Sequence, residues 1–117
     1  MSSPTTGPPP RRRRWGQHFL KDAAAADRLV RLFEIGEEDR VIEIGPGDGA
    51  LTLPLARRVA RLVALEIDPA RVPLLEERLA PWPHAEVRLA NAVEADWAKL
   101  AEEVGPPVRV VGNLPYN

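Results

Sequence analysis

A glycine-rich segment at residues 41–52, VIEIGPGDGALT, constrains the fold of this chain more than any other feature. Its first four residues form a short β-branched run, which indicates a strand, and residues 51–59 carry apolar side chains at helical spacing. Glycine adopts positive φ readily and lets a ligand lie directly against the main chain. The segment therefore predicts a strand, a tight loop through Gly45, Gly47 and Gly49, and a helix N-terminus whose free N–H groups face a nucleotide-like ligand.

The loop also fits the fingerprint of dinucleotide-binding proteins. Gly45, Gly47 and Ala50 match the spacing G-x-G-x-x-G/A, and Glu66 closes the next apolar run 21 residues after Gly45. In that fingerprint the acidic residue binds a ribose hydroxyl. The pattern alone leaves three interpretations open: NAD, S-adenosylmethionine, or a glycine-rich turn without a ligand.

Three neighbouring residues favour S-adenosylmethionine over NAD. Asp48 introduces a negative charge into the loop, which would repel a pyrophosphate but not the ammonium or sulfonium of S-adenosylmethionine. Pro46 removes one N–H donor that a phosphate would use. Glu43 adds a second carboxylate near the same end of the loop. We therefore expect S-adenosylmethionine to be the preferred ligand.

The size and composition of the chain suit one modest soluble domain, with 117 residues, of which 44% are hydrophobic and 28% charged. Its apolar runs are far shorter than the roughly 20 residues that span a bilayer, and its N-terminus lacks the apolar core of a signal peptide. The absence of cysteine excludes disulfides and thiolate chemistry and suits a cytoplasmic protein. His18 and His84 are isolated in the sequence, so we expect neither a metal site nor a catalytic histidine pair.

Composition divides the chain near residue 14. Residues 1–10 contain four prolines and no apolar periodicity, which is typical of a disordered or polyproline-like tail. Four arginines follow, Arg11 to Arg14, and the remaining residues include 12 basic and 17 acidic side chains. We expect a tail over 1–13 and a folded domain over 14–117. The arginine run is compatible with binding along a nucleic-acid backbone and equally with a solvated segment that aids solubility.

Hydrophobic periodicity alternates between helical and extended segments along the folded part. The pattern predicts helices at 22–34, 50–59, 69–79 and 94–104, and strands at 41–44, 62–67, 86–89 and 108–111. Asp22 is the expected cap of the first helix, and Gly36 its end. Pro69 is expected to open the third helix, where Pro73 is tolerable only near the start. We therefore predict a doubly wound α/β fold with parallel strands and right-handed crossovers.

Polar residues follow each of the four predicted strands: the glycine loop, Glu66, Asn91 and Asn113. In doubly wound sheets ligands bind at the carboxyl ends of the strands. Glu66 is suited to accept hydrogen bonds from both ribose hydroxyls, and the Asn91 carbonyl to accept from an adenine amine. Taken alone, Glu66 fits a solvated acid and Asn91 a turn residue. Asp68 is expected to cap the next helix rather than bind a ligand.

The closing residues, Asn113-Leu114-Pro115-Tyr116, form a second motif with chemical meaning. An amine conjugated to an aromatic ring is a weak nucleophile because its lone pair is delocalised. The Asn113 side-chain oxygen and the carbonyl of Leu114, held extended by Pro115, can accept both amine hydrogens. Tyr116 can stack on the base. Catalysis would then be alignment for in-line methyl transfer without a general base, and a strand-ending turn with an exposed tyrosine is the alternative.

Four segments together resemble, in order and in spacing, the ribosomal RNA adenine dimethyltransferases of the KsgA type. They are GQHFL at 16–20, EIGPGDGALT at 43–52, LEID at 65–68 and NLPYN at 113–117. The resemblance implies a Rossmann-like fold, S-adenosylmethionine as cofactor, and dimethylation of the N6 amines of two adjacent adenosines near the 3' end of small-subunit ribosomal RNA. It also implies a cytoplasmic enzyme of ribosome biogenesis that uses no metal and is a monomer when complete.

By position, the resemblance implies a set of cofactor contacts and a motif that holds the target base. The cofactor contacts are His18, Leu20, Gly45, Gly47, Glu66, Asn91 and Asn113, and the base is held by Asn113, Leu114, Pro115 and Tyr116. The family usually has Asn in place of His18 and Asp in place of Asn91. Both differences keep hydrogen-bonding capacity, although either could weaken cofactor binding.

The family continues well beyond the last motif, so we expect an N-terminal fragment that holds the first four strands and is at best weakly active. Single-adenine methylases of large-subunit RNA share the same motifs. The alternatives from other classes are a non-catalytic fragment that binds cofactor or RNA, and an NAD-binding oxidoreductase domain.

Overall fold

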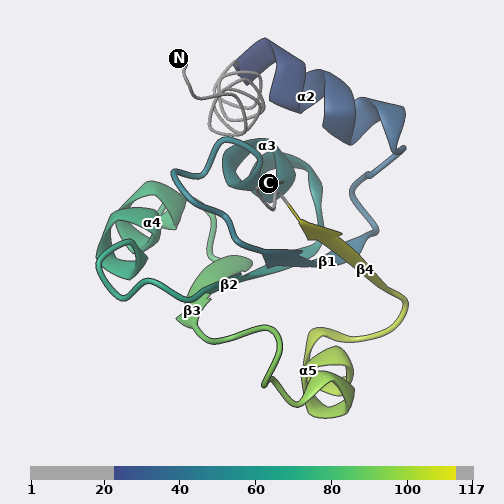
Figure 1. Ribbon diagram of the computed structural model, residues 1–117. Coiled ribbons are helices and arrows are strands. Elements are labelled where there is room, and N and C mark those ends of the chain that lie inside the picture. The colour runs from purple at the N-terminus through teal and green to yellow at the C-terminus, as the bar shows by residue number, and fades with distance from the viewer. Residues whose placement is uncertain (1–22, 113–117) are drawn as a thin grey trace, which may run out of the picture.

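The computed structural model describes residues 23–112, whose arrangement is shown in Figure 1. His18, Leu20, the arginine run and the motif from Asn113 to Tyr116 lie outside the described residues. Helices and strands alternate as the sequence predicts, with the ends of several elements shifted by a few residues. The elements are α2 (Ala23–Leu32), β1 (Arg40–Ile44), α3 (Thr52–Arg58), β2 (Arg61–Glu66), α4 (Val72–Leu79), β3 (Ala85–Leu89), α5 (Trp97–Val104) and β4 (Val108–Gly112).

The four strands form one parallel sheet in the order β3-β2-β1-β4. In the centre, Val41 of β1 pairs with Leu62 of β2 and with Arg109 of β4. Helices α2, α3 and α4 lie on one face of the sheet and α5 on the other (Figure 1). The chain runs outward from β1 to β3 and then returns to β4, so the strand order reverses between β1 and β4. The predicted doubly wound α/β fold is confirmed, with this switch point at its centre.

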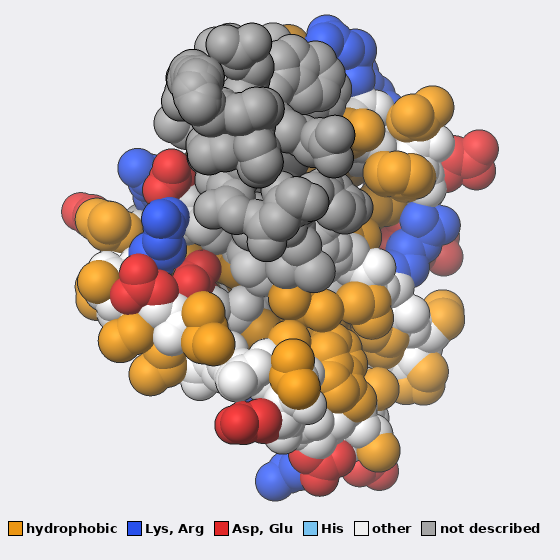
Figure 2. All heavy atoms as spheres, in the orientation of Figure 1, with side chains coloured by type: hydrophobic (Ala, Val, Ile, Leu, Met, Phe, Trp, Pro, Cys, Tyr) orange, Lys and Arg blue, Asp and Glu red, His pale blue; other side chains and the backbone are white. Residues whose placement is uncertain are grey.

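Alternate residues of the strands contribute to two cores because successive side chains point to opposite faces. The core beneath α2, α3 and α4 includes Val41, Leu55, Leu62 and Leu75. The smaller core beneath α5 consists of Ile42, Val63, Leu65, Leu100 and Val104. At the sheet edge Val110 of β4 is 53% exposed, and Figure 2 shows hydrophobic side chains gathered below the centre of the view. None of the described helices is long and apolar enough to cross a membrane.

The end of α2 differs from the prediction. The helix ends at Leu32, and the left-handed residue that follows is Glu34, with φ of 56°, rather than Gly36. The N–H of Ile35 donates to Val30 O at 3.1 Å, and the N–H of Glu34 donates to Arg31 O at 3.0 Å, which is the Schellman arrangement. Because Ile35 and Val30 are both buried in one core, their packing fixes the left-handed turn two residues earlier than the glycine suggests.

The start of α4 also differs. The helix begins at Val72 rather than at Pro69, and Pro73 stands in its first turn, where a missing N–H costs nothing. Asp68 does not cap the helix, because its Oδ1 accepts from the N–H of Ala70 at 2.9 Å within the preceding turn. This turn lengthens the connection that follows β2 at the sheet edge.

Candidate functional site

The glycine loop joins β1 to α3 at the carboxyl edge of the sheet. Gly45, Gly47 and Gly49 have φ values of 70°, 58° and 91°, so all three adopt the positive φ expected from the sequence. At Gly49 a β-carbon would also lie 3.3 Å from Leu75 Cδ2 of α4. The loop therefore needs glycine both for its backbone conformation and for the close approach of α4.

The N–H groups of these three glycines donate hydrogen bonds within the protein rather than standing free. The acceptors are Leu65 O for Gly45 at 3.1 Å, Glu66 Oε1 for Gly47 at 3.3 Å, and Pro46 O for Gly49 at 2.9 Å. The expectation of free glycine donors is therefore wrong for this part of the loop. Since a pyrophosphate is bound mainly by such donors, the observed pattern favours a ligand that lies against the glycines without needing their N–H groups.

Glu66, at the carboxyl end of β2, connects the loop to the next turn. It is 5% exposed, and besides accepting from the N–H of Gly47 it accepts from the N–H of Asp68 at 2.9 Å through Oε2. An ionised carboxylate has about four acceptor positions, so lone pairs remain for further donors such as ribose hydroxyls. The solvated-acid interpretation of Glu66 is wrong, because its side chain is buried and held by two backbone donors.

Glu43 lies in the middle of the same region but is fully buried on β1. Its Oε1 accepts from Thr52 Oγ1 of α3 at 2.7 Å, whereas Oε2 has no hydrogen-bond partner among the described residues. Burial raises the pKa of Glu43 to about 7, the hydrogen bond from Thr52 opposes this rise, and the nearby charge of Glu66 adds to it. Glu43 is therefore partly protonated near neutral pH and does not act as a fixed second negative charge.

The charge of Asp48 is compensated in the structure. Its Oδ1 lies 2.8 Å from Nη1 of Arg71, and Arg78 donates to its backbone oxygen, so both arginines near α4 hold this part of the loop. Repulsion of a pyrophosphate by Asp48 is consequently weaker than the sequence suggests. The internal use of the glycine N–H groups is the better structural argument against a dinucleotide.

Asn91 follows β3 at the same edge of the sheet. Its Oδ1 accepts from the N–H of Val93 at 2.9 Å, which confirms the turn interpretation of this residue. The N–H of the preceding Ala90 donates to Glu66 O at 2.9 Å, so the segment before Asn91 is attached to β2. The carbonyl oxygen predicted to meet adenine already has one donor, although a second lone pair remains.

The structure thus brings the glycine loop, Glu66 and Asn91 together along the carboxyl edge of β1, β2 and β3. β4 reaches this edge as well, because Gly112 pairs with Ile44, one residue before Asn113 in the sequence. Within residues 23–112, no three potential metal-ligating side chains gather at any point.

Two residues of the site were not singled out from the sequence. Thr52 orients Glu43, and its only sequence signal is a polar residue before the apolar first turn of α3. Arg71 compensates Asp48 across 23 residues, a contact with no local signal. His84, by contrast, lies away from the site, with Nε2 2.7 Å from the carbonyl oxygen of Ala56.

Comparison with sequence families finds a family model that matches most of the chain. The family model described as ribosomal RNA adenine dimethylase matches residues 10–117. The chain is 41% identical to ribosomal RNA small subunit methyltransferase A of Chromohalobacter salexigens, over 99% of this chain and 43% of the relative. It is 46% identical to the protein of the same name from Salinibacter ruber, over 86% of this chain and 33% of the relative. The chain thus spans less than half the length of these curated relatives.

Solved structures of related methyltransferases have the same fold as this chain. The 23S rRNA methyltransferase ErmE superposes with a TM-score of 0.69 at 34% identity, covering 85% of this chain and 38% of that one. A dimethyladenosine transferase from Plasmodium falciparum gives a TM-score of 0.65 at 26% identity, with coverage of 85% and 34%. An RNA methyltransferase from Salinibacter ruber, in complex with S-adenosyl-L-homocysteine, gives 0.55 at 30% identity, with coverage of 62% and 50%. The fold is thus that of the Rossmann-like methyltransferases, and the chain belongs to the ribosomal RNA adenine dimethylase family.

Proposed function

We propose that this chain is the cofactor-binding part of an S-adenosylmethionine-dependent methyltransferase that dimethylates the N6 amines of two adjacent adenosines in small-subunit ribosomal RNA. The observation that carries the proposal is the placement of Glu66. This buried acid is held by two backbone N–H groups, and the described residues give it no cationic partner. Its remaining lone pairs and its charge are therefore available to a ligand at the carboxyl edge of the sheet.

The chemistry of the edge suits S-adenosylmethionine better than a dinucleotide. Glu66 would accept from the ribose hydroxyls, and Gly45 and Gly47 would let the ligand approach the main chain. Asn91 would contact the adenine edge. We propose His18, Leu20 and Asn113 as the remaining cofactor contacts, on the strength of the family motifs.

The reaction asks two things of the protein: to hold the acceptor amine and to align it with the methyl donor. S-adenosylmethionine, when bound, supplies an electrophilic methyl group. Asn113 and the carbonyl of Leu114 would accept hydrogen bonds from the amine and direct its lone pair, while Pro115 keeps Leu114 extended and Tyr116 stacks on the base. No general base is required, because the methylated amine loses its proton readily afterwards. The residues act by alignment.

Calorimetric titration with S-adenosylhomocysteine and with NAD tests the cofactor. We expect S-adenosylhomocysteine to bind and NAD to bind more weakly or not at all. Asp96→Asn, which alters only the cap of α5, is a matched control that should leave both results unchanged. Preferential binding of NAD would contradict the proposal and favour an oxidoreductase domain.

A second candidate is methylation of large-subunit ribosomal RNA, favoured by the similarity to the 23S rRNA methyltransferase ErmE. Incubation with each unmethylated ribosomal subunit, followed by mass spectrometry of the digested RNA, separates the two. Dimethyladenosine in small-subunit RNA supports our first proposal, and modification confined to large-subunit RNA supports the second.

We further propose that the chain alone is at best weakly active, since its relatives are more than twice as long. The complete enzyme would be a cytoplasmic monomer without a metal requirement. Methyl transfer by this chain at the rate of a complete relative would contradict the first point, and loss of that relative's activity on adding EDTA would contradict the last.

A further inference from the structure

Helices α2 and α3 together carry four arginines and a single acidic residue, Asp27. Asp27 of α2 lies 2.9 Å from Arg58 of α3 and 3.2 Å from Arg31 of α2. The hydrogen bond from Arg58 is the main cause of the lowered pKa of Asp27, and the charges of Arg31 and Arg57 lower it further. Arg28, beside Asp27 in sequence, is the fourth arginine. We call Arg28, Arg31, Arg57 and Arg58 the basic corner.

The basic corner is not neutralised by the residues around it. Arg28 and Arg57 are exposed, and neither has an ion pair or a hydrogen bond from its side chain among residues 23–112. Asp27 is the only acid paired with Arg31 or Arg58 in that range, so four positive charges meet one negative charge. In Figure 2 basic side chains lie over α2 at the top of the view. Such an excess is unexpected on a body with more acids than bases.

The basic corner is remote from the proposed cofactor site. Arg57 and Arg58 end α3, and the chain then enters the amino end of β2 at Arg61. Glu66 stands at the other end of that strand, five residues after Arg61, or roughly 16 Å away along the strand. A ligand on the basic corner would therefore be separate from the cofactor.

We propose that the basic corner binds the phosphate backbone of the RNA substrate, as a second contact outside the reaction site. The proposal rests on the proposed function, which makes RNA the substrate. Guanidinium groups bind phosphates through two parallel N–H donors. Arg28 and Arg57 present free donors, while Asp27 holds Arg31 and Arg58 beside them on two packed helices. Such contacts position RNA without reading its sequence.

The test is fluorescence anisotropy of the chain with a labelled RNA hairpin across a salt series. Arg28→Gln and Arg57→Gln should each weaken binding several-fold at low salt and reduce the slope of log K against log salt by roughly 0.7–0.9. Lys99→Gln, which removes an exposed cation on α5, is the matched control and should change little. Asp27→Asn should strengthen binding, a gain that misfolding cannot mimic.

The inference would be overturned if the unmodified chain did not bind RNA, or if Lys99→Gln and Arg57→Gln had equal effects. It would also be overturned if replacing only Arg11 to Arg14 with Gln abolished binding. Tighter binding to phosphatidylserine vesicles than to RNA would likewise contradict it. Calorimetry with S-adenosylhomocysteine on the same proteins keeps the two proposals distinguishable. If that ligand does not bind but the RNA results hold, the proposed function fails and the basic corner stands.

Discussion

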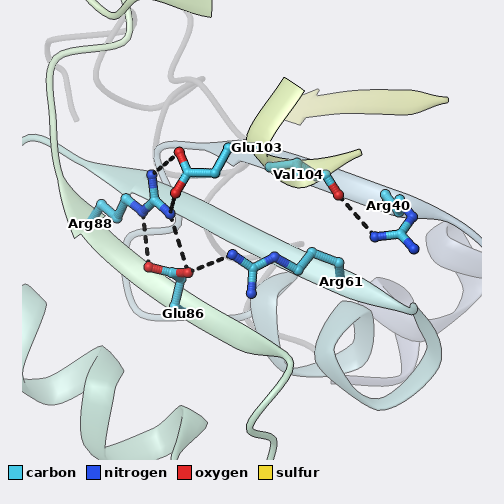
Figure 3. Close-up of polar contacts among 6 residues, drawn as sticks. All are labelled: Arg40, Arg61, Glu86, Arg88, Glu103 and Val104. Atoms are coloured by element: carbon cyan, nitrogen blue, oxygen red, sulfur yellow. Dashed lines mark hydrogen bonds and ion pairs between the residues drawn. The ribbon is translucent and has the colours of Figure 1, made fainter. Parts of the chain in front are cut away.

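Acidic side chains on the two faces of the sheet have different kinds of hydrogen-bond partners. On the face beneath α3, Glu43 and Glu66 are buried and receive hydrogen bonds from a hydroxyl and from backbone N–H groups. On the face beneath α5, Glu86 and Glu103 are held by guanidinium groups. Figure 3 shows this second cluster, in which Arg88 lies between the two carboxylates and Arg61 contacts Glu86 from the neighbouring strand.

The pKa values follow the difference in partners. Hydrogen bonds from Arg88 are the main cause of the lowered pKa of both Glu86 and Glu103. Burial without a cation instead raises the pKa of Glu43 to about 7. A carboxylate that already has an arginine partner has little left to offer a ligand, whereas Glu66, which is held by two backbone N–H groups, keeps lone pairs for further donors. The comparison indicates that the acids beneath α5 are structural and that Glu66, on the opposite face, serves binding.

The largest expected effect is on ligand binding through Glu66. Glu66→Gln removes the charge while keeping the size, and we expect the affinity for S-adenosylhomocysteine to fall about 10- to 100-fold, since hydrogen bonds to charged groups contribute about 1.5–3 kcal/mol. Isothermal calorimetry measures this. The matched control is Glu86→Gln on the other face, for which affinity should not change. An unchanged affinity of Glu66→Gln for S-adenosylhomocysteine would contradict the assignment of Glu66 to the cofactor site.

The raised pKa of Glu43 should be visible in the pH dependence of the free energy of unfolding. Its folded pKa of about 7 lies above the ordinary value of 4.5, so between these pH values the native state binds more protons than the unfolded state. The free energy of unfolding should therefore fall as pH rises through this window, by about 3 kcal/mol from this group. Urea denaturation of the chain and of Glu43→Gln, compared at each pH, isolates the effect. Parallel curves for the two proteins would show that Glu43 titrates normally.

A smaller effect is expected from the glycine loop itself. Gly49→Ala places a β-carbon at φ of 91° and 3.3 Å from Leu75, so we expect a loss of about 1–2 kcal/mol in the free energy of unfolding. Gly36→Ala is the control, because a β-carbon there meets nothing within 4 Å. Equal urea midpoints for the two variants would contradict the observed loop.

The smallest effect is expected in the α5 cluster. The Arg88 side chain is 30% exposed, and ion pairs at this depth contribute little after screening by water and salt. Arg88→Gln should lower the free energy of unfolding by about 1 kcal/mol or less, with the loss shrinking in 1 M salt. The affinity for S-adenosylhomocysteine should stay the same. A clear drop in that affinity would contradict the claim that the cluster beneath α5 has only a structural role.

Much of the fold was predictable because local sequence patterns indicate its helices and strands. The β-branched runs at β1 and β2 and the helical spacing of Leu100 and Val104 gave the right order of elements, and positive φ at Gly45 follows from the motif. The errors came from tertiary packing. Ile35 docks into the core and moves the left-handed turn from Gly36 to Glu34.

The residues of the candidate site could be predicted from the sequence, but the partners and the protonation of its charged side chains could not. Glu66 and Asn91 could be placed at one sheet edge because parallel strands end together. The pairing of Arg71 with Asp48 and the raised pKa of the buried Glu43 both depend on contacts between distant segments, and neither has a local sequence pattern. The roles of His18, Leu20 and Asn113 to Tyr116 stay predictions.

The most direct test of the account is a backbone amide NMR titration with S-adenosylhomocysteine. We predict chemical-shift changes at Gly45, Gly47, Glu66 and Asn91, with the amide of Arg88 unaffected. Changes concentrated around Arg88 and α5, or no changes at the glycine loop at saturating ligand, would contradict the claim that the loop-side edge of the sheet is the cofactor site.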